Sequence, residues 1–306
     1  MHAEQIAFAV EDACRQDVRA FKPGNVSVGA PGHNMHSEDF LRSAAAIGAP
    51  LSAAGATVGA RIARAVAATR QVVSCNTNLG IVLLCAPLAV ARERAGDATV
   101  TPAALQGVLG DVLQGLTVAD ADACYGAIRQ ASPGGLGTAP AHDVSSAPQV
   151  TLLAAMQAAA GHDRIAREYA EGYPLVFGTG VQTLQAMRDA GVPELWALTR
   201  TFLTLAAAVP DTHVQRKHGA DCARDVQMQA AGLLAEWPLQ AGLAHPWQAL
   251  QALDRDWKAR GINPGTTADL VVASALVMRL TFSEGYNGAR HETRALEVCG
   301  NAVQSA

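Results

Sequence analysis

Residues 74–90 read Ser-Cys-Asn-Thr-Asn-Leu-Gly-Ile-Val-Leu-Leu-Cys-Ala-Pro-Leu-Ala-Val, a polar cluster followed at once by an apolar run. A segment that is apolar on every side is typical of a helix buried in a protein core. The run over 79–90 is interrupted by Gly80 and Pro87 and is too short to span a bilayer. The stretch therefore predicts a buried helix that begins at a group of polar side chains.

The same arrangement recurs further along the chain. An apolar run over 195–209 leads into Pro-Asp-Thr-His-Val-Gln-Arg-Lys-His-Gly at 210–219, and Asn-Pro-Gly-Thr-Thr at 263–267 precedes a second apolar run. Residues 22–36 are rich in turns and in side-chain donors. Because unpaired N–H groups and the helix dipole favour anions at helix starts, we expect these polar helix N-termini to converge on one nucleotide site.

Helical periodicity dominates the rest of the chain, which shows no alternating strand pattern and no internal repeat. Further helices are predicted over 6–18, 37–47, 52–73, 102–113, 118–128, 152–160, 165–169, 181–187, 193–208, 222–237 and 270–280. Half of the residues are hydrophobic, mostly Ala and Leu, which suits closely packed helices. The sequence therefore predicts an all-α protein: one multi-helix catalytic domain over 1–282 and a polar tail over 283–306.

Charge and cysteine usage narrow the class of function. The net charge is −4 with both signs mixed, so no basic stripe indicates nucleic acid, and a small-molecule substrate is favoured. The six cysteines are scattered without a CxxC pair, and the N-terminus carries charges that a signal peptide lacks. We expect a cytoplasmic protein that is not inserted in a membrane, and its Ala-rich helices would allow a homodimer.

Six short motifs occur in one order along residues 5–280. They are Phe21-Lys22-Pro23-Gly24-Asn25-Val26, Gly32-His33-Asn34-Met35 with 40–44, Asn76-Thr77 with Gly80, residues 168–174, Asp211-Thr212, and Asn263-Pro264-Gly265 with Ala268-Asp269-Leu270. Together they resemble the triphosphoribosyl-dephospho-CoA synthase family, whose members serve citrate lyase and malonate decarboxylase. The resemblance implies an all-helical transferase that joins ATP to dephospho-CoA at the ribose C1′ and releases adenine.

The resemblance also implies what the protein must supply. Such a displacement passes through an oxocarbenium-like state, so it needs a base for the attacking hydroxyl, an acid for adenine and countercharge for the triphosphate. Mg²⁺ suits the phosphates, held by one or two carboxylates and by substrate oxygens. ATP would then be a substrate, and Mg²⁺ the cofactor.

Some positions depart from the family pattern. Asn78-Leu79 stands where the family has His-Lys, and Ser27 stands where an Asp is common; Arg216 and Lys217 would replace the lost lysine. The loop over 132–147, with Asp143, is more similar to a divergent branch in methanogens and methylotrophs. Two alternatives follow: a nucleotide-dependent step on a C1-carrier precursor (methanopterin or methanofuran), or a non-catalytic nucleotide-binding subunit.

The motifs supply the candidate site residues, each with a plainer structural alternative. Asp211 and Asp269 are predicted to bind metal or act as base, or else to cap and stabilise their helices. Glu168 is predicted to be catalytic, or to lie on a helix surface. The predicted phosphate and substrate ligands are Lys22, Asn25, His33, Asn76, Thr77, Asn78, Asp143, Arg216, Lys217, Asn263 and Thr266. Several of these residues are equally suited to capping helices or forming turns.

Overall fold

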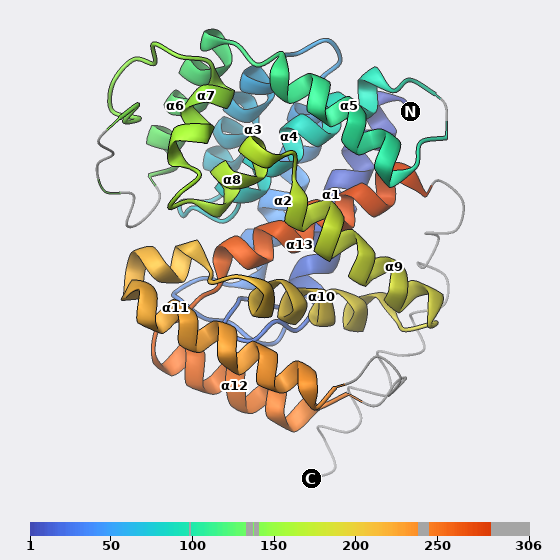
Figure 1. Cartoon of the computed structure of the whole chain (residues 1–306), viewed down its shortest axis with the longest axis vertical. Coiled ribbons are helices and arrows are strands. Elements are labelled where there is room, and N and C mark those ends of the chain that lie inside the picture. The colour runs from blue at the N-terminus through green and yellow to red at the C-terminus, as the bar shows by residue number, and fades with distance from the viewer. Residues whose placement is uncertain (98, 133–136, 138–140, 238–244, 283–306) are drawn as a thin grey trace.

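The computed structural model describes residues 1–97, 99–132, 137, 141–237 and 245–282 (Figure 1). These residues form α-helices and one π-helical segment and contain no β-strand, which confirms the predicted all-α fold. The elements are α1 (Ala3–Arg19), α2 (Ser37–Leu51), α3 (Val58–Val72), α4 (Leu79–Arg94), α5 (Pro102–Gln114), α6 (Val118–Ala131), α7 (Leu152–Ala159), α8 (Arg164–Glu171), η1 (Val176–Val181), α9 (Gln182–Asp189), α10 (Glu194–Ala208), α11 (Thr212–Ala235), α12 (Trp247–Ala259) and α13 (Gly265–Thr281). The predicted tail over 283–306 lies outside the described residues.

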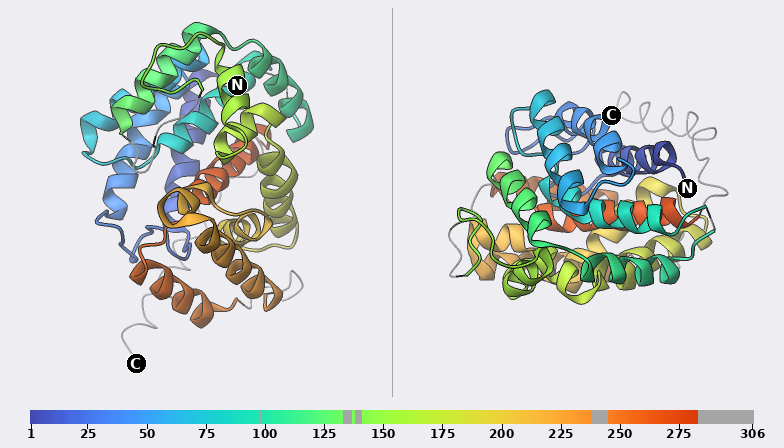
Figure 2. Two further views of the ribbon diagram at one scale, coloured as in Figure 1. Left: turned by 60° about the vertical axis from the view of Figure 1, so that its left-hand side comes forward. Right: turned by 90° about the horizontal axis from the view of Figure 1, so that it is seen from above.

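The two helices predicted to be apolar all round, α4 and α13, form the centre of the molecule. Nearly every residue of each is buried, and the two helices pack against each other. Helices α3 and α5–α8 lie at one end, α10–α12 lie at the other, and α13 crosses between them (Figure 1). The two views in Figure 2 show α13, in red, enclosed between the early helices in blue and the later ones in green and gold.

Some element boundaries differ from the sequence prediction. Helix α3 begins only at Val58, because Thr57 accepts a hydrogen bond from Ala60 N–H and caps it. Within α11, two helical segments meet at a kink at Gly219, whose φ of 87° few other residues adopt. Helix α12 was not predicted at all. It presents Leu250 and Trp257 to the core within an otherwise charged sequence.

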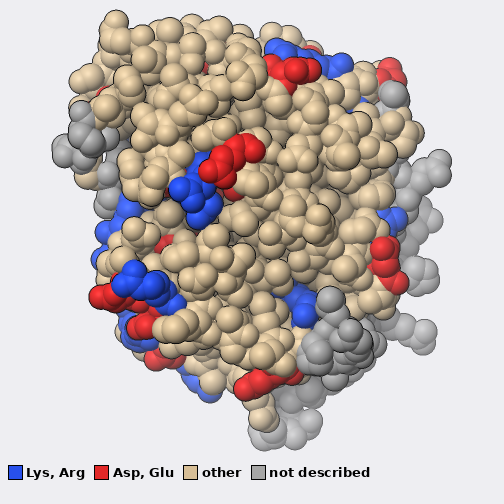
Figure 3. Space-filling model, in the orientation of Figure 1, with Lys and Arg blue, Asp and Glu red and all other residues tan. Residues whose placement is uncertain are grey.

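No helix in the described part of the chain combines the length and the apolar character needed to cross a membrane. On the face shown in Figure 3, positive and negative side chains lie close together in small groups and form no continuous basic stripe.

Pro87 in the middle of α4 leaves one carbonyl without its helical partner, and a buried tyrosine supplies the missing hydrogen bond. Proline has no N–H, so the Leu83 carbonyl four residues earlier loses its helical partner. The buried Tyr169 hydroxyl donates to that carbonyl at 2.6 Å. The Tyr173 hydroxyl donates to the next carbonyl, Leu84, at 3.1 Å. Helix α8 and the turn after it are thereby fixed against α4.

We expect Tyr169→Phe to destabilise the protein by about 1–3 kcal/mol, because the buried Leu83 carbonyl then has no partner. Tyr173→Phe is the matched control. It should cost clearly less, because the Leu84 carbonyl also lies in the normal helical register of the Leu88 N–H. Urea unfolding of both variants measures the difference, and equal losses would contradict this explanation.

Candidate active site

A cavity of about 330 Å³ lies where the starts of α4, α8, α11 and α13 meet α1 and α2. The predicted convergence of polar helix starts is therefore found in the structure. Nine of the predicted site residues line the cavity: Asn25, Asn76, Thr77, Asn78, Asp143, Arg216, Asn263, Thr266 and Asp269. Lys22, His33, Glu168, Asp211 and Lys217 do not line it.

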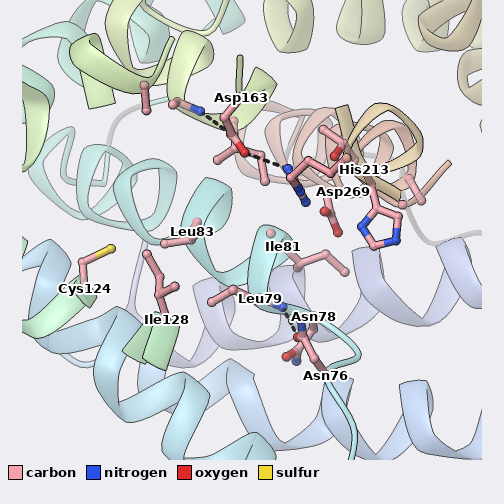
Figure 4. Close-up of a pocket in the computed structure, with 18 of the residues that line it drawn as sticks. Asn76, Asn78, Leu79, Ile81, Leu83, Cys124, Ile128, Asp163, His213 and Asp269 are labelled. Carbon is pink, nitrogen blue, oxygen red and sulfur yellow. Dashed lines mark hydrogen bonds and ion pairs between the residues drawn. The ribbon is translucent and has the colours of Figure 1, made fainter. Parts of the chain in front are cut away.

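The cavity has two chemically different ends. Asp163, His213 and Asp269 lie at one end, and Cys124, Ile128 and Leu83 lie at the other (Figure 4). The apolar end is completed by Leu152, Ala155 and Met156 from α7. Such a division suits a ligand that has both an anionic group and a flat or apolar group.

Asp269, in the first turns of α13, lies at the polar end against the start of α4. A Cβ at Gly80 would stand 2.0 Å from Asp269 Oδ2, so only glycine allows this approach. No hydrogen bond or ion pair to the Asp269 side chain is formed within the described residues. Burial raises the pKa of Asp269 well above its usual range, and the nearby Asp211 and Asp17 raise it further. The carboxyl group is thus available to a ligand.

Asp211 follows the structural alternative. Its Oδ1 accepts the Val214 N–H at 2.9 Å and caps α11. Its Oδ2 accepts both the N–H and the hydroxyl of Thr267, each at 2.7 Å. The carboxylate is buried, and both of its oxygens accept hydrogen bonds, one from α11 and the other from α13. Asp211 does not line the cavity that Asp269 lines, and metal binding by these two residues stays a prediction.

Arg216 is the one Lys or Arg of the described residues that lines the cavity. Its Nη1 lies 3.0 Å from Oδ2 of Asp163, whose Oδ1 caps α8 by accepting the Ala166 N–H at 2.9 Å (Figure 4). Lys217, the next residue, is exposed outside the wall. Arg216 is thus held at the cavity by the first residue before α8.

The predicted amide and hydroxyl ligands are partly used in building the wall. Asn76 Oδ1 accepts the Leu79 N–H at 3.2 Å, and Asn78 Nδ2 donates to Thr69. The hydroxyls of Thr77 and Ser43 lie 2.6 Å apart, Asn25 Nδ2 donates to Asn263 Oδ1 at 2.9 Å, and Thr266 pairs with Thr212. Capping and ligand contact are compatible here, because each of these side chains also faces the cavity.

Lys22 is fully buried and lies behind the wall. Its Nζ lies 2.8 Å from Asp17 Oδ2 and also donates to the Asp17 carbonyl. The structure places no direct phosphate contact at Lys22. Asp17 itself does line the cavity.

Glu168 is also buried away from the wall. Its carboxylate accepts the N–H groups of Leu175 and Val176 and so caps the turn into η1. Burial raises the pKa of Glu168 to about 7, although these two hydrogen bonds oppose the shift. Glu168 is therefore not the exposed helix residue of the structural alternative, and its catalytic role stays a prediction.

The remaining two candidates lie in loops. The His33 ring Nε2 lies 2.7 Å from the Gly24 carbonyl and ties the 22–36 loop together. Asp143 Oδ1 accepts the N–H and hydroxyl of Ser145, which is the turn-forming alternative, while the residue still reaches the cavity wall. Residues 133–136 and 138–140 of that loop lie outside the described residues.

Comparison with known proteins decides the family. A sequence model of the family CitG, ATP:dephospho-CoA triphosphoribosyl transferase, matches residues 3–287. The chain belongs to this family. The resemblance seen in the six sequence motifs is thereby confirmed.

Individual CitG-family relatives match only in part. A 2-(5″-triphosphoribosyl)-3′-dephosphocoenzyme-A synthase of Pectobacterium atrosepticum is 36% identical over 110 residues, covering 36% of this chain and 34% of the relative. A Pseudomonas putida protein named for the same activity is 38% identical over 109 residues, covering 35% and 38%. The match thus spans about a third of these curated relatives.

A solved structure supports the fold. A chain from Archaeoglobus fulgidus named for the same synthase superimposes with a TM-score of 0.62 at 21% identity. The superposition covers 80% of this chain and 99% of the other. The all-α architecture is therefore one that a solved structure shares.

Sequence reasoning missed three side chains at the polar end: Asp17, Asp163 and His213. Asp17 had a usable signal, since it follows Val10 and Cys14 on the apolar stripe of α1, where a carboxylate is unexpected. His213 lines the cavity with a buried Nε2 that has no partner among the described residues. Burial lowers the pKa of His213 to about 4, and the neighbouring Lys217 and Arg216 lower it further. The imidazole is therefore neutral at physiological pH.

If the cavity binds Mg²⁺ and ATP, as proposed below, Gly80→Ala should weaken that binding about tenfold or more, because the added methyl group displaces the Asp269 carboxylate. Gly107→Ala in α5 is the matched control, since nothing lies within 4 Å of its added Cβ. Isothermal titration calorimetry measures both affinities. Equal binding by the two variants would show that the contact between Gly80 and Asp269 has no role at the site.

Glu168 should make stability depend on pH. Its folded-state pKa of about 7 lies above the unfolded value of about 4.5, so the folded state binds the extra proton in this range. Stability is then full below about pH 4.5 and falls as the pH rises through about 7. Glu168→Gln should flatten this slope in urea unfolding, whereas Glu38→Gln, at an exposed position, should leave it unchanged. A slope that survives Glu168→Gln would assign the effect to another group.

Proposed function

We propose that this protein transfers the triphosphoribosyl group of ATP to dephospho-CoA, as the name of its family describes. The observation that carries the proposal is one cavity with a polar end at four helix starts and an apolar end at α6 and α7. Helix starts suit the triphosphate, and the apolar end suits a purine base. The two ends thus match the two chemically different parts of ATP.

The chemistry requires one bond to form and one to break at the same carbon. A ribose hydroxyl of dephospho-CoA attacks C1′ of the ATP ribose and passes its proton to a base. The C1′–N bond to adenine breaks with its electron pair on the adenine nitrogen, which takes up a proton, so no net proton is gained or lost. His213 is neutral and its Nε2 is unpartnered within the described structure, so it can accept a hydrogen bond from that hydroxyl. Arg216 provides countercharge for phosphate at the polar end.

The residues at the polar end also fit Mg²⁺. The described residues contain no cluster of three His, Cys, Asp or Glu that would form an all-protein metal site. Mg²⁺, however, is commonly bound by one or two carboxylates together with substrate phosphates. Asp269 offers such a carboxylate, in a recess that only a glycine at position 80 leaves open. The ion, when bound, would neutralise phosphate charge.

The two alternatives from the sequence are less well supported. The relatives described above are named for triphosphoribosyl transfer to dephospho-CoA, and no observation favours a C1-carrier step or a non-catalytic subunit. Dependence on Mg²⁺, dimerisation and a cytoplasmic location stay predictions.

Incubation with ATP, Mg²⁺ and dephospho-CoA should release free adenine in a one-to-one ratio with the triphosphoribosylated product, measured by chromatography and mass spectrometry. Asp269→Asn should lower the rate by a factor on the order of 100 or more, because it removes the available carboxylate. Asp111→Asn, on the exposed side of α5, is the control and should leave the rate unchanged. Adenine release only with a C1-carrier precursor would instead support the first alternative.

A further inference from the structure

The charge pattern behind the cavity wall assigns a task to the lysine of the Lys22-Pro23-Gly24 motif. Lys22 and Asp17 form a fully enclosed ion pair, with the lysine side chain 0% and the aspartate side chain 8% exposed. Both donor contacts of Lys22 go to Asp17, one to Oδ2 and one to the backbone carbonyl. The lysine therefore fixes the conformation of Asp17 and leaves Oδ1 as its only uncommitted oxygen.

That oxygen is unusual in a folded protein. Asp17 Oδ1 is buried and has no hydrogen-bond partner, although a buried carboxylate oxygen without one is costly. The residue lines the same cavity as Asp269. A carboxylate oxygen that lies at a ligand cavity and has no protein partner can bind a cation that enters with the ligand.

Asp17 and Asp269 also lie near each other. Helix α1 packs along α13, Asp17 on α1 and Asp269 on α13 line the same cavity, and the Asp17 charge raises the pKa of Asp269. Asp211, by contrast, uses its two oxygens to join α11 and α13. Two carboxylates with free oxygens at the polar end are thus Asp269 and Asp17.

We propose that Asp17 is the second carboxylate ligand of the divalent cation that enters with the nucleotide, and that Lys22 is its positioning residue. The proposal rests on the proposed function for the identity of the nucleotide. It replaces the sequence expectation for two residues: Lys22 orients a metal ligand instead of binding phosphate, and Asp17 takes the place expected for Asp211.

The test uses Mn²⁺ as the probe, with ATP present and no acceptor, so that no turnover is needed. Electron paramagnetic resonance measures free Mn²⁺ in titrations of the full-length protein. The double variant D17N/K22M removes both charges together, so no buried charge is left unpaired. We expect its affinity for Mn²⁺ with ATP to fall about tenfold or more.

A second Lys–Asp pair, Lys258 and Asp254, contacts the loop over 22–36 and provides a matched control. Lys258 lies 3.0 Å from Asp254, which accepts the Gly24 N–H, and both residues lie outside the cavity wall. D254N/K258M should therefore keep the parent affinity for Mn²⁺. Equal affinity in the two double variants and the parent would overturn the proposal, and so would equal losses in both, because the effect would then belong to the loop.

Two further measurements keep the outcomes distinct. If D17N/K22M does not fold, crystals of the parent grown with Mn²⁺ and ATP decide. An anomalous peak should lie within coordinating distance of Asp17 Oδ1 and Asp269, and a peak elsewhere or none would refute the assignment.

Intact Mn²⁺ binding at these residues without adenine release would overturn the proposed function alone. Adenine release with unchanged Mn²⁺ affinity in D17N/K22M would overturn this inference alone.

Discussion

One buried carboxylate, that of Asp211, determines the geometry of the polar end. It caps α11 through the Val214 N–H and binds both donors of Thr267 in the first turn of α13. Because α13 is enclosed by other helices along its whole length, this contact fixes α11 against the centre of the molecule. His213 and Arg216 on α11 and Asp269 on α13 then face one cavity. Burial raises the pKa of Asp211, and these hydrogen bonds oppose part of that shift.

The fold was largely predictable because its central elements are unambiguous. Two segments that are apolar on all sides can only be buried helices in a chain without strand periodicity, and α4 and α13 are those segments. The weaker elements were not predictable in the same way. Helix α12 turns only a few large apolar residues to the core, so its pattern does not stand out from a charged loop. The start of α3 depends on the hydrogen bond that Thr57 accepts as its N-cap, and apolar periodicity does not reveal such a side-chain contact.

The sequence predicted which segments meet at the candidate site. It did not predict which polar residues there stabilise helices and which are left free for a ligand. Polar clusters in front of apolar helices correctly indicated which segments meet at the cavity. A polar residue at a helix start, however, can serve its own helix, a neighbouring helix or a ligand. Asp211 serves the first two, and Asp269, two residues beyond Thr267, lacks a protein partner in the described structure. That difference depends on pairings between residues more than 50 positions apart, which no local pattern encodes.

Arg216 at the polar end and Lys22 behind the cavity wall are each paired with a carboxylate. The loss of a lysine at Leu79 suggested that Arg216 and Lys217 would supply the missing countercharge. Arg216 does reach the wall, yet Asp163 already binds it, and Lys22 is neutralised by Asp17. The described wall thus offers a triphosphate one cation that is already paired, Arg216, beside the carboxylates of Asp17 and Asp269, while Lys22 lies behind the wall. These carboxylates favour a polyphosphate that brings its own divalent cation, since the cation can bind both phosphate and carboxylate oxygens. The acidic character of this site therefore supports the proposal that the nucleotide binds together with a divalent cation.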